Sequence, residues 1–326
     1  MKSKLKTPAL LLFLMAAFAF PAVVKDVFFI HLGVVFGIWI ILAFGLNLIV
    51  GYTGQVSFCH AAFMGIGAYV SALLTLRAGF NFWTCLPFGI AAAGLLALLI
   101  GLPSFRLRGA YFSIITLAFG ELVRIVFHNW RAVTNGPDGI PAIPAPPSIP
   151  VPLLSRLDFS EKWAYYYLVL VAAVICGLML YAMVRSRLGR AFLAIREDES
   201  YAQSIGINTM RYKLLSFVLG AMFAGLAGCL YAHYFLYISP DSFTVFQSFD
   251  VLLMVIVGGM GSIVGPVIGV IFLTALPEYL HLAAGYRMVI YGFLLMVITI
   301  LAPLGIRGAV VSAVNRFNRR SEGLAG

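Results

Sequence analysis

Residues 27–57 read VFFIHLGVVFGIWIILAFGLNLIVGYTGQVS, an apolar run that ends in glycines and uncharged polar residues. A helix needs about 20 mostly apolar residues to cross the core of a bilayer. Several other segments meet this condition, since 62% of the 326 residues are hydrophobic and 10% are charged. The runs are too long and too continuous for the alternating strands of a membrane barrel. The sequence therefore predicts an all-α integral membrane protein.

The apolar segments predict about ten transmembrane helices in a single transmembrane domain, residues 1–326. We expect the first run to be a retained helix rather than a cleaved signal peptide, because it is long enough to span and more membrane protein follows. Glycines and Pro266 interrupt the 249–276 run, so it is divided into two short spans. The predicted spans are residues 8–24, 27–50, 60–76, 82–105, 109–127, 162–184, 214–237, two within 249–276, and 288–304.

Lysines and arginines concentrate in the first six residues, in the 185–213 loop and in the 307–320 tail. Cytoplasmic segments of membrane proteins carry such an excess. All three lie on one side only if the 249–276 run crosses the membrane twice. We therefore expect both termini and the 185–213 loop to be cytoplasmic and the Pro-rich 128–161 loop to be periplasmic. The net charge of +10 then reflects membrane topology rather than nucleic-acid binding.

Two glycine-rich segments resemble each other. Residues 49–54 read IVGYTG and residues 256–261 read IVGGMG, and each follows an apolar run that enters from outside. This similarity favours a parallel internal repeat of spans 1–4 and 7–10, an architecture known in transporters. The alternative is a chance likeness between short glycine-rich stretches.

The break at 51–57 is polar but uncharged. Irregular backbone at membrane depth is tolerated where it lines a cavity or is buried in protein. The break therefore predicts either a wall of a solute pathway or close helix packing through small residues, and the second break, around 258–265, leaves the same two interpretations. The candidate pathway residues are Asn47, Gly51, Gly54, Gln55, Ser57, Glu121, Gly258, Gly259, Gly261 and Ser262.

Glu121 and Arg124 lie inside a predicted span, where charges are costly and usually paired. Their i,i+3 spacing places them on one helix face. The interpretations are an internal ion pair or, alternatively, contact of the carboxylate with a substrate ammonium.

The 185–213 loop combines charged and apolar residues. Its stretch from Arg190 to Ile205 predicts a short helix that stops at Gly206. Such a helix suits docking into a groove of another protein, and the alternative is a solvated connector. The candidate docking residues are Arg190, Arg196, Glu197, Asp198, Glu199, Ala202 and Gly206.

The sequence contains none of the motifs that would indicate catalysis or metal binding. The sequence has no phosphate-binding loop, no zinc-protease motif and no paired cysteine motif, and its four cysteines are scattered in apolar runs. We therefore expect a protein that is not an enzyme and that binds no metal or cofactor.

The loop at 199–206 (ESYAQSIG) resembles the cytoplasmic EAA loop of ABC-importer permeases, although Ser200 stands where that loop usually has its first alanine. The wider chain resembles the M-type permeases of branched-chain amino acid importers. The stretches that carry this resemblance are residues 45–57, 106–113, 134–140, 195–199 and 257–262.

The resemblance implies a subunit of an importer for leucine, isoleucine and valine in the bacterial inner membrane. It implies an H-type permease as partner, a periplasmic binding protein, and two ATPase subunits that hold ATP and magnesium and dock on the 185–213 loop. The alternatives are a same-family importer of urea, amides or other amino acids, and an ion-coupled secondary transporter.

Overall fold

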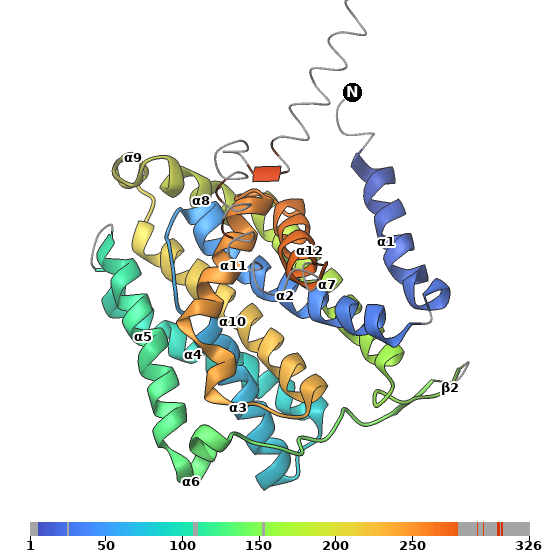
Figure 1. Cartoon of the computed structure of the whole chain (residues 1–326). Coiled ribbons are helices and arrows are strands. Elements are labelled where there is room, and N and C mark those ends of the chain that lie inside the picture. The colour runs from blue at the N-terminus through green and yellow to red at the C-terminus, as the bar shows by residue number, and fades with distance from the viewer. Residues whose placement is uncertain are drawn as a thin grey trace, which may run out of the picture.

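The structure is a computed structural model that describes residues 6–24, 26–106, 110–151 and 154–279 and the single positions 292, 296, 305, 306 and 308. Figure 1 shows a bundle of long helices with α8 and α9 at one end and α6 at the other. The elements in chain order are α1 (Lys6–Val23), α2 (Val27–Thr53), α3 (His60–Ala78), α4 (Phe82–Ser104), α5 (Ala110–Asn129), α6 (Arg131–Thr134), η1 (Gly136–Asp138), β1 (Ile149–Val151), β2 (Leu154–Leu157), α7 (Lys162–Arg185), α8 (Arg187–Glu197), α9 (Glu199–Ser204), α10 (Thr209–Phe235), η2 (Pro240–Phe243), α11 (Val245–Gly258) and α12 (Val264–Tyr279).

In the part of the chain that the structure describes, seven helical segments are long and apolar enough to cross a membrane. The all-α, multi-pass class is therefore confirmed, and the described strands form only one short antiparallel hairpin, β1–β2. The 249–276 run divides, as predicted, into the short antiparallel helices α11 and α12. The last predicted span, 288–304, lies outside the described residues apart from positions 292 and 296, so the count of ten remains a prediction. The seven segments are Val27–Thr53, His60–Ala78, Phe82–Ser104, Tyr111–Asn129, Lys162–Arg185, Thr209–Phe235 and Pro240–Gly258.

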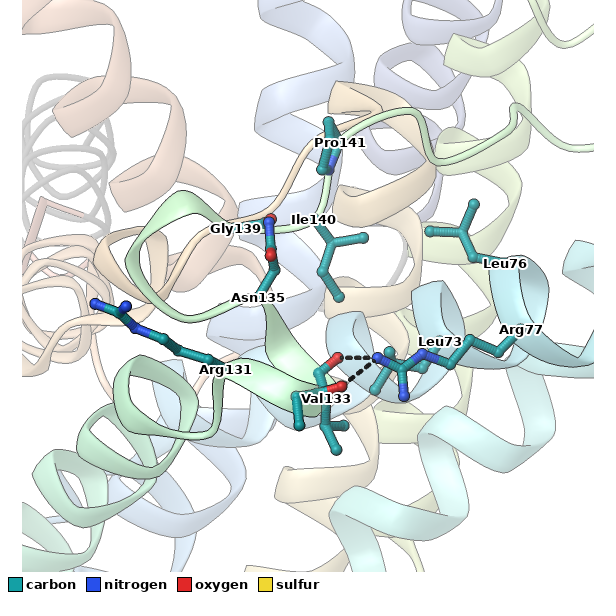
Figure 2. Close-up of a pocket in the computed structure, with 10 residues that line it drawn as sticks. Leu73, Leu76, Arg77, Arg131, Val133, Asn135, Gly139, Ile140 and Pro141 are labelled. Atoms are coloured by element: carbon teal, nitrogen blue, oxygen red, sulfur yellow. Dashed lines mark hydrogen bonds between the residues drawn. The ribbon is translucent and has the colours of Figure 1, made fainter.

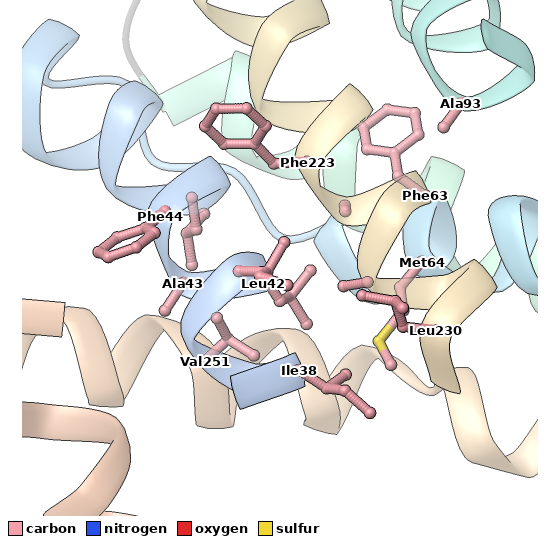
Figure 3. Close-up of a cluster of buried hydrophobic side chains, with 14 of the residues drawn as sticks. Ile38, Leu42, Ala43, Phe44, Phe63, Met64, Ala93, Phe223, Leu230 and Val251 are labelled. Carbon is pink, nitrogen blue, oxygen red and sulfur yellow. The ribbon is translucent and has the colours of Figure 1, made fainter. Parts of the chain in front are cut away.

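Helix α10 is the centre of the bundle, packed against α2, α3 and α4. Figure 3 shows side chains such as Leu42, Phe63 and Leu230 meeting in this buried region. Small residues let α10 approach α3 closely: a Cβ on Gly228 would overlap the carbonyl oxygen of Met64. Close approach through small residues replaces the hydrophobic driving force that lipid does not supply between helices.

The predicted end of the second span at Val50 is wrong. Helix α2 continues through the glycine motif to Thr53, whose Oγ1 donates to the carbonyl of Ile49 at 2.7 Å. The helix ends at Thr53 because the next residue, Gly54, has φ +71°, the left-handed conformation that favours glycine at a helix C-terminus. Gly51 is therefore a helical residue, and the irregular stretch is 54–59.

Residues 54–59 run as a non-helical segment beside α5 (Figure 1). Side chains of α5 satisfy its backbone: Ser113 donates to the carbonyl of Val56 at 2.8 Å, and Thr116 Oγ1 accepts from the amide of Phe58 at 3.2 Å. Irregular backbone therefore lies beside a span without leaving these polar groups unpaired, as membrane depth requires.

The 128–161 loop contains short helices and strands (α6, η1, β1 and β2) rather than a long helix, as its Pro and Gly content predicts. It is fastened to the bundle by pairing of Ile140 with Ile238 and by two bonds from Arg77 Nη2 to the carbonyls of Ala132 and Val133, at 2.7 and 3.0 Å. Figure 2 shows these bonds beside a shallow pocket of about 340 Å³. Arg77 therefore holds the loop, and it contributes to one wall of this pocket.

Candidate coupling and translocation site

The 185–213 loop folds into two helices, where one from Arg190 to Ile205 was predicted. Asp198 separates α8 from α9, because its backbone is extended, with φ −156° and ψ 110°. Its carboxylate instead accepts the amides of Ser200 and Tyr201 at 2.8 and 2.9 Å and so caps α9. An aspartate that competes for backbone amides in this way favours a helix start over a helix interior. The predicted stop at Gly206 is found, with φ +87°.

Glu199 fastens α9 to the start of α10. Its carboxylate accepts from Lys213 Nζ at 2.6 Å and from Thr209 Oγ1 at 3.2 Å. The Lys213 side chain is 5% exposed, so this ion pair is largely withdrawn from water on the lysine side. Ala202 is the fully buried residue of α9, whereas Tyr201 and Ile205 are exposed. The result is a projection that is bonded to α10 and carries apolar groups on its outer surface.

Replacing Glu199 with alanine is expected to lower the melting temperature of the purified protein, because the buried Lys213 ammonium loses its carboxylate. The expected cost is about 1–3 kcal/mol of unfolding free energy. Exposed Glu197 on α8 is the control, and its replacement with alanine is expected to stay within about 0.5 kcal/mol. If both variants melt at the wild-type temperature, the Glu199–Lys213 pair does not stabilise α9.

Arg196 connects α8 to both glycine-rich segments. Its Nη1 donates to the carbonyl oxygen of Gly51 at 2.5 Å. Its side chain also lies over Gly54 and Gly261, since a Cβ on Gly54 would stand 3.3 Å from Arg196 Cγ and a Cβ on Gly261 would stand 2.5 Å from Arg196 Nη1. A charged hydrogen bond of this kind is roughly twice as strong as a neutral one. Arg196 therefore joins α8 to the end of α2.

Asn47 joins the two glycine-rich segments to each other. Its Nδ2 donates to the carbonyl of Ser262 at 2.8 Å, and its Oδ1 accepts from the amide of Gly261 at 3.0 Å. Asn47 is fully buried. A side chain on Gly51 would collide with Asn47 Oδ1 and with the Gly261 amide, so glycine is needed where the segments meet. We call Asn47, Gly51, Arg196, Gly261 and Ser262 the glycine junction.

The second break is closed by Ser262. Its Oγ donates to the carbonyl of Gly259 and accepts from the amide of Gly265, both at 2.9 Å. Gly258 lies where α11 and α12 touch, because a Cβ there would overlap the carbonyl of Gly265. This break is therefore a tight, internally bonded turn between two antiparallel helices. The breaks had two interpretations, a pathway wall or close helix packing. The contacts at Gly51 and Gly258 are those of close helix packing.

The candidate pathway residues fall into separate groups. The glycine junction contains Asn47, Gly51, Gly261 and Ser262, Gly258 and Gly259 lie in the adjoining α11–α12 turn, and Gly54 lies beside the junction under Arg196. Gln55 is half-buried in the stretch after α2, and Ser57 is fully buried near His60. Glu121 lies elsewhere, on α5.

Glu121 and Arg124 form the ion pair that their spacing predicts. Arg124 donates through Nε and Nη2 to the same oxygen, Glu121 Oε1, at 2.9 and 2.5 Å. Asp241 in η2 is a further carboxylate, 3.9 Å from Arg124 Nη1. The Glu121 side chain is 39% exposed and that of Arg124 is 27% exposed, so the pair lies on the surface of the chain.

Sequence reasoning missed Thr209, Lys213 and Asp241 as partners of the candidate residues. The Glu199–Lys213 and Arg124–Asp241 contacts join residues on different elements, and neither has a helical spacing that would reveal it. The signal available was a lysine early in an otherwise apolar span, which requires a partner. Within the described ranges no group of three or more His, Cys, Asp or Glu side chains could hold a metal ion.

A family model described as "Branched-chain amino acid transport system / permease component" matches residues 28–301. The chain belongs to this family. The permease is 37% identical over 286 residues to LivM, a permease protein of the high-affinity branched-chain amino acid transport system of Escherichia coli K12, a match that covers 82% of this chain and 67% of that relative.

More distant relatives are also permease proteins of high-affinity branched-chain amino acid transport systems. LivH of Salmonella typhimurium is 29% identical over 283 residues, which cover 82% of this chain and 90% of LivH. BraD of Pseudomonas aeruginosa is 26% identical over 297 residues, which cover 82% of this chain and 91% of BraD. No solved structure matches the chain. The permease is thus a multi-pass transport subunit whose resemblance to the M-type proteins is confirmed.

Proposed function

We propose that this chain is the M-type permease subunit of an ABC importer for leucine, isoleucine and valine and forms half of its translocation pathway. The observation that carries the proposal is the direct bond from Arg196 in α8 to Gly51 at the end of α2. It gives a helix outside the spans a mechanical connection to both glycine-rich segments. The identity to LivM supports the substrate class.

The partners follow from this role. An H-type permease completes the pathway, a periplasmic binding protein delivers the amino acid, and two ATPase subunits dock on α8 and α9. ATP and magnesium reside on those ATPases, and this chain binds no cofactor, no metal and no nucleic acid. The exposed Tyr201 and Ile205 support α9 as part of the docking surface, because they offer apolar groups beside charged ones.

The proposed topology is about ten spans in the bacterial inner membrane, with residues 1–326 as one permease domain, both termini and the 185–213 loop cytoplasmic, and the 128–161 loop periplasmic. Helices α2 and α11 support it, because both end on the side that carries α8 (Figure 1). Their meeting at Asn47 also supports the parallel repeat, since both similar segments contribute to the glycine junction.

The mechanism needs no covalent step on this chain. A ligand or partner shifts an equilibrium only through different contacts with its two states. ATP binding moves the ATPases against α8 and α9, Arg196 transmits the movement to Gly51, and Asn47 carries it from α2 to the α11–α12 turn. The pathway then opens to alternate sides.

Uptake into proteoliposomes that contain both permeases and both ATPases tests the proposal. We expect leucine to enter only with the binding protein and ATP, and isoleucine and valine to compete while urea does not. Uptake of urea or an amide instead would favour the other importers of this scaffold. Uptake driven by an ion gradient without ATP would make the chain a secondary transporter.

A further inference from the structure

Among the long spans that the structure describes, charged side chains away from the helix ends lie on two neighbouring helices. Glu121 and Arg124 lie within the span Tyr111–Asn129, and Asp250 lies within Pro240–Gly258. The other long spans carry their charges at or near their ends, at Arg77, Lys162, Arg185, Arg211 and Lys213. Helices α5 and α11 are in contact, and η2, which bears Asp241, also touches α5.

These charges point out of the chain rather than into its core. Glu121 and Arg124 are 39% and 27% exposed, and Asp250 is exposed as well. Glu121 lies near the middle of α5, about 12 Å along the helix from Asn129. A charge facing lipid at such a depth costs about 2.5–3.5 kcal/mol even on insertion scales. This surface therefore faces water or protein.

The ion pair leaves hydrogen-bonding groups open on that surface. Both bonds from Arg124 end on Glu121 Oε1, so Glu121 Oε2 has no partner among the described residues. Arg124 Nη1 has only a distant carboxylate, Asp241 at 3.9 Å. An open carboxylate oxygen beside an open guanidinium nitrogen matches the ammonium and carboxylate of an amino acid.

We propose that the stripe of α5 around Glu121 is a water-facing wall of the solute pathway, where Glu121 and Arg124 contact the ammonium and carboxylate of a zwitterionic substrate. The inference deepens the proposed function and rests on it. Leu117 and Ile125, one turn on either side of Glu121, are 39% and 47% exposed and belong to the same stripe. The adjoining irregular stretch exposes Val56 beside Ser113 of α5.

Cysteine accessibility tests the wall. Leu117→Cys and Ile125→Cys are made singly in the complete importer and treated with a charged, membrane-impermeant thiol reagent from the periplasmic side. The four native cysteines are buried, so the unaltered chain gives the background. Ile175→Cys on α7 is the matched control, because Ile175 is 51% exposed and lies at a similar depth from Lys162 as Leu117 does from Asn129.

We expect both α5 cysteines to be labelled at least about tenfold faster than Ile175→Cys, since only a water-facing site admits a charged reagent. If neither α5 cysteine reacts with the reagent, with or without ATP, lipid or a partner chain covers the stripe. The proposal that the stripe is a water-facing wall is then refuted. Co-purification of the ATPases verifies that each variant is assembled, and a variant that fails this control is replaced by the other position.

Substrate protection tests the contact. Leucine supplied with the binding protein and ATP is expected to slow labelling of Leu117→Cys, and the additional change Glu121→Gln is expected to remove this protection. Labelling that leucine does not slow overturns the zwitterion contact. The labelling rate itself does not depend on which solute is imported, so an unlabelled stripe in a leucine-transporting complex refutes this inference and leaves the proposed function standing.

Discussion

Replacing Asn47 with leucine is expected to reduce leucine uptake by at least about tenfold while the protein still inserts in the membrane. Leucine has a similar size but makes neither of the bonds that Asn47 makes to the Gly261 amide and the Ser262 carbonyl. Each buried group left unpaired costs about 1–3 kcal/mol. The loss of two therefore weakens the contact between α2 and the α11–α12 turn by about 2–6 kcal/mol, where 1.4 kcal/mol is already tenfold in an equilibrium.

The control for Asn47→Leu is Thr53→Val at the same end of α2. Thr53 is equally buried, but its hydroxyl donates to Ile49 within its own helix and otherwise meets Ser216 Oγ of α10 at 3.4 Å, so it bonds to neither Gly261 nor Ser262. We expect this variant to keep at least about half of the wild-type uptake, because the hydrogen bonds it loses contribute only about 1 kcal/mol each and neither joins α2 to the α11–α12 turn. Equal losses in the two variants would mean that any polar deletion at this helix end is harmful, and Asn47 would then have no specific joining role.

The apolar composition alone shows that most of this chain is surrounded by a bilayer rather than by water. The membrane class and most helices could therefore be predicted from the sequence. Helix α3 was predicted at residues 60–76 and lies at His60–Ala78, and the fourth and sixth predicted spans match α4 and α7 within one residue at each end. Charged or glycine residues flank these runs, and a backbone in lipid has no alternative to a helix between such boundaries.

The ends of helices near the site were less predictable because tertiary contacts decide them. Gly51 reads as a helix breaker in sequence, yet α2 continues past it since Asn47 and Gly261 pack where its side chain would be. Asp198 reads as one more charge in an exposed helix, yet it caps α9. At Gly51 the outcome depended on Gly261, a partner far along the chain, whereas at Asp198 it depended on which of two nearby arrangements the backbone takes, helix interior or helix cap.

The similarity of the two glycine motifs was visible in the sequence, but their contact was not. Similarity predicts a shared local structure, and here the first motif is helical through Thr53 while the second turns at Gly259. Their meeting requires Asn47, which stands outside both motifs. A residue of this kind becomes identifiable only when the helices are placed side by side.

Arg196→Ala is expected to separate ATP hydrolysis from transport. The variant removes the bond to the Gly51 carbonyl, and a hydrogen bond to a charged group contributes about 1.5–3 kcal/mol, so uptake is expected to fall by about 10- to 100-fold. The ATPases still dock on α8 and α9, because Asp198 and Glu199 hold that projection independently of Arg196. ATP hydrolysis by the assembled complex is therefore expected to persist while leucine uptake, measured in the same proteoliposomes, fails.

Arg211→Ala tests whether loss of a positive charge alone, without loss of the hydrogen bond to the Gly51 carbonyl, reduces transport. Arg211 is exposed at the start of α10, on the same side of the bundle, and has the same charge as Arg196. We expect Arg211→Ala to keep near-wild-type coupling. Arg196→Lys is expected to restore coupling only in part, because an ammonium lacks the planar reach of the guanidinium. If Arg196→Ala transports at the wild-type rate, the force from α8 does not pass through Gly51. If it loses ATP hydrolysis as well, Arg196 acts in docking, and the glycine junction is reached by another route.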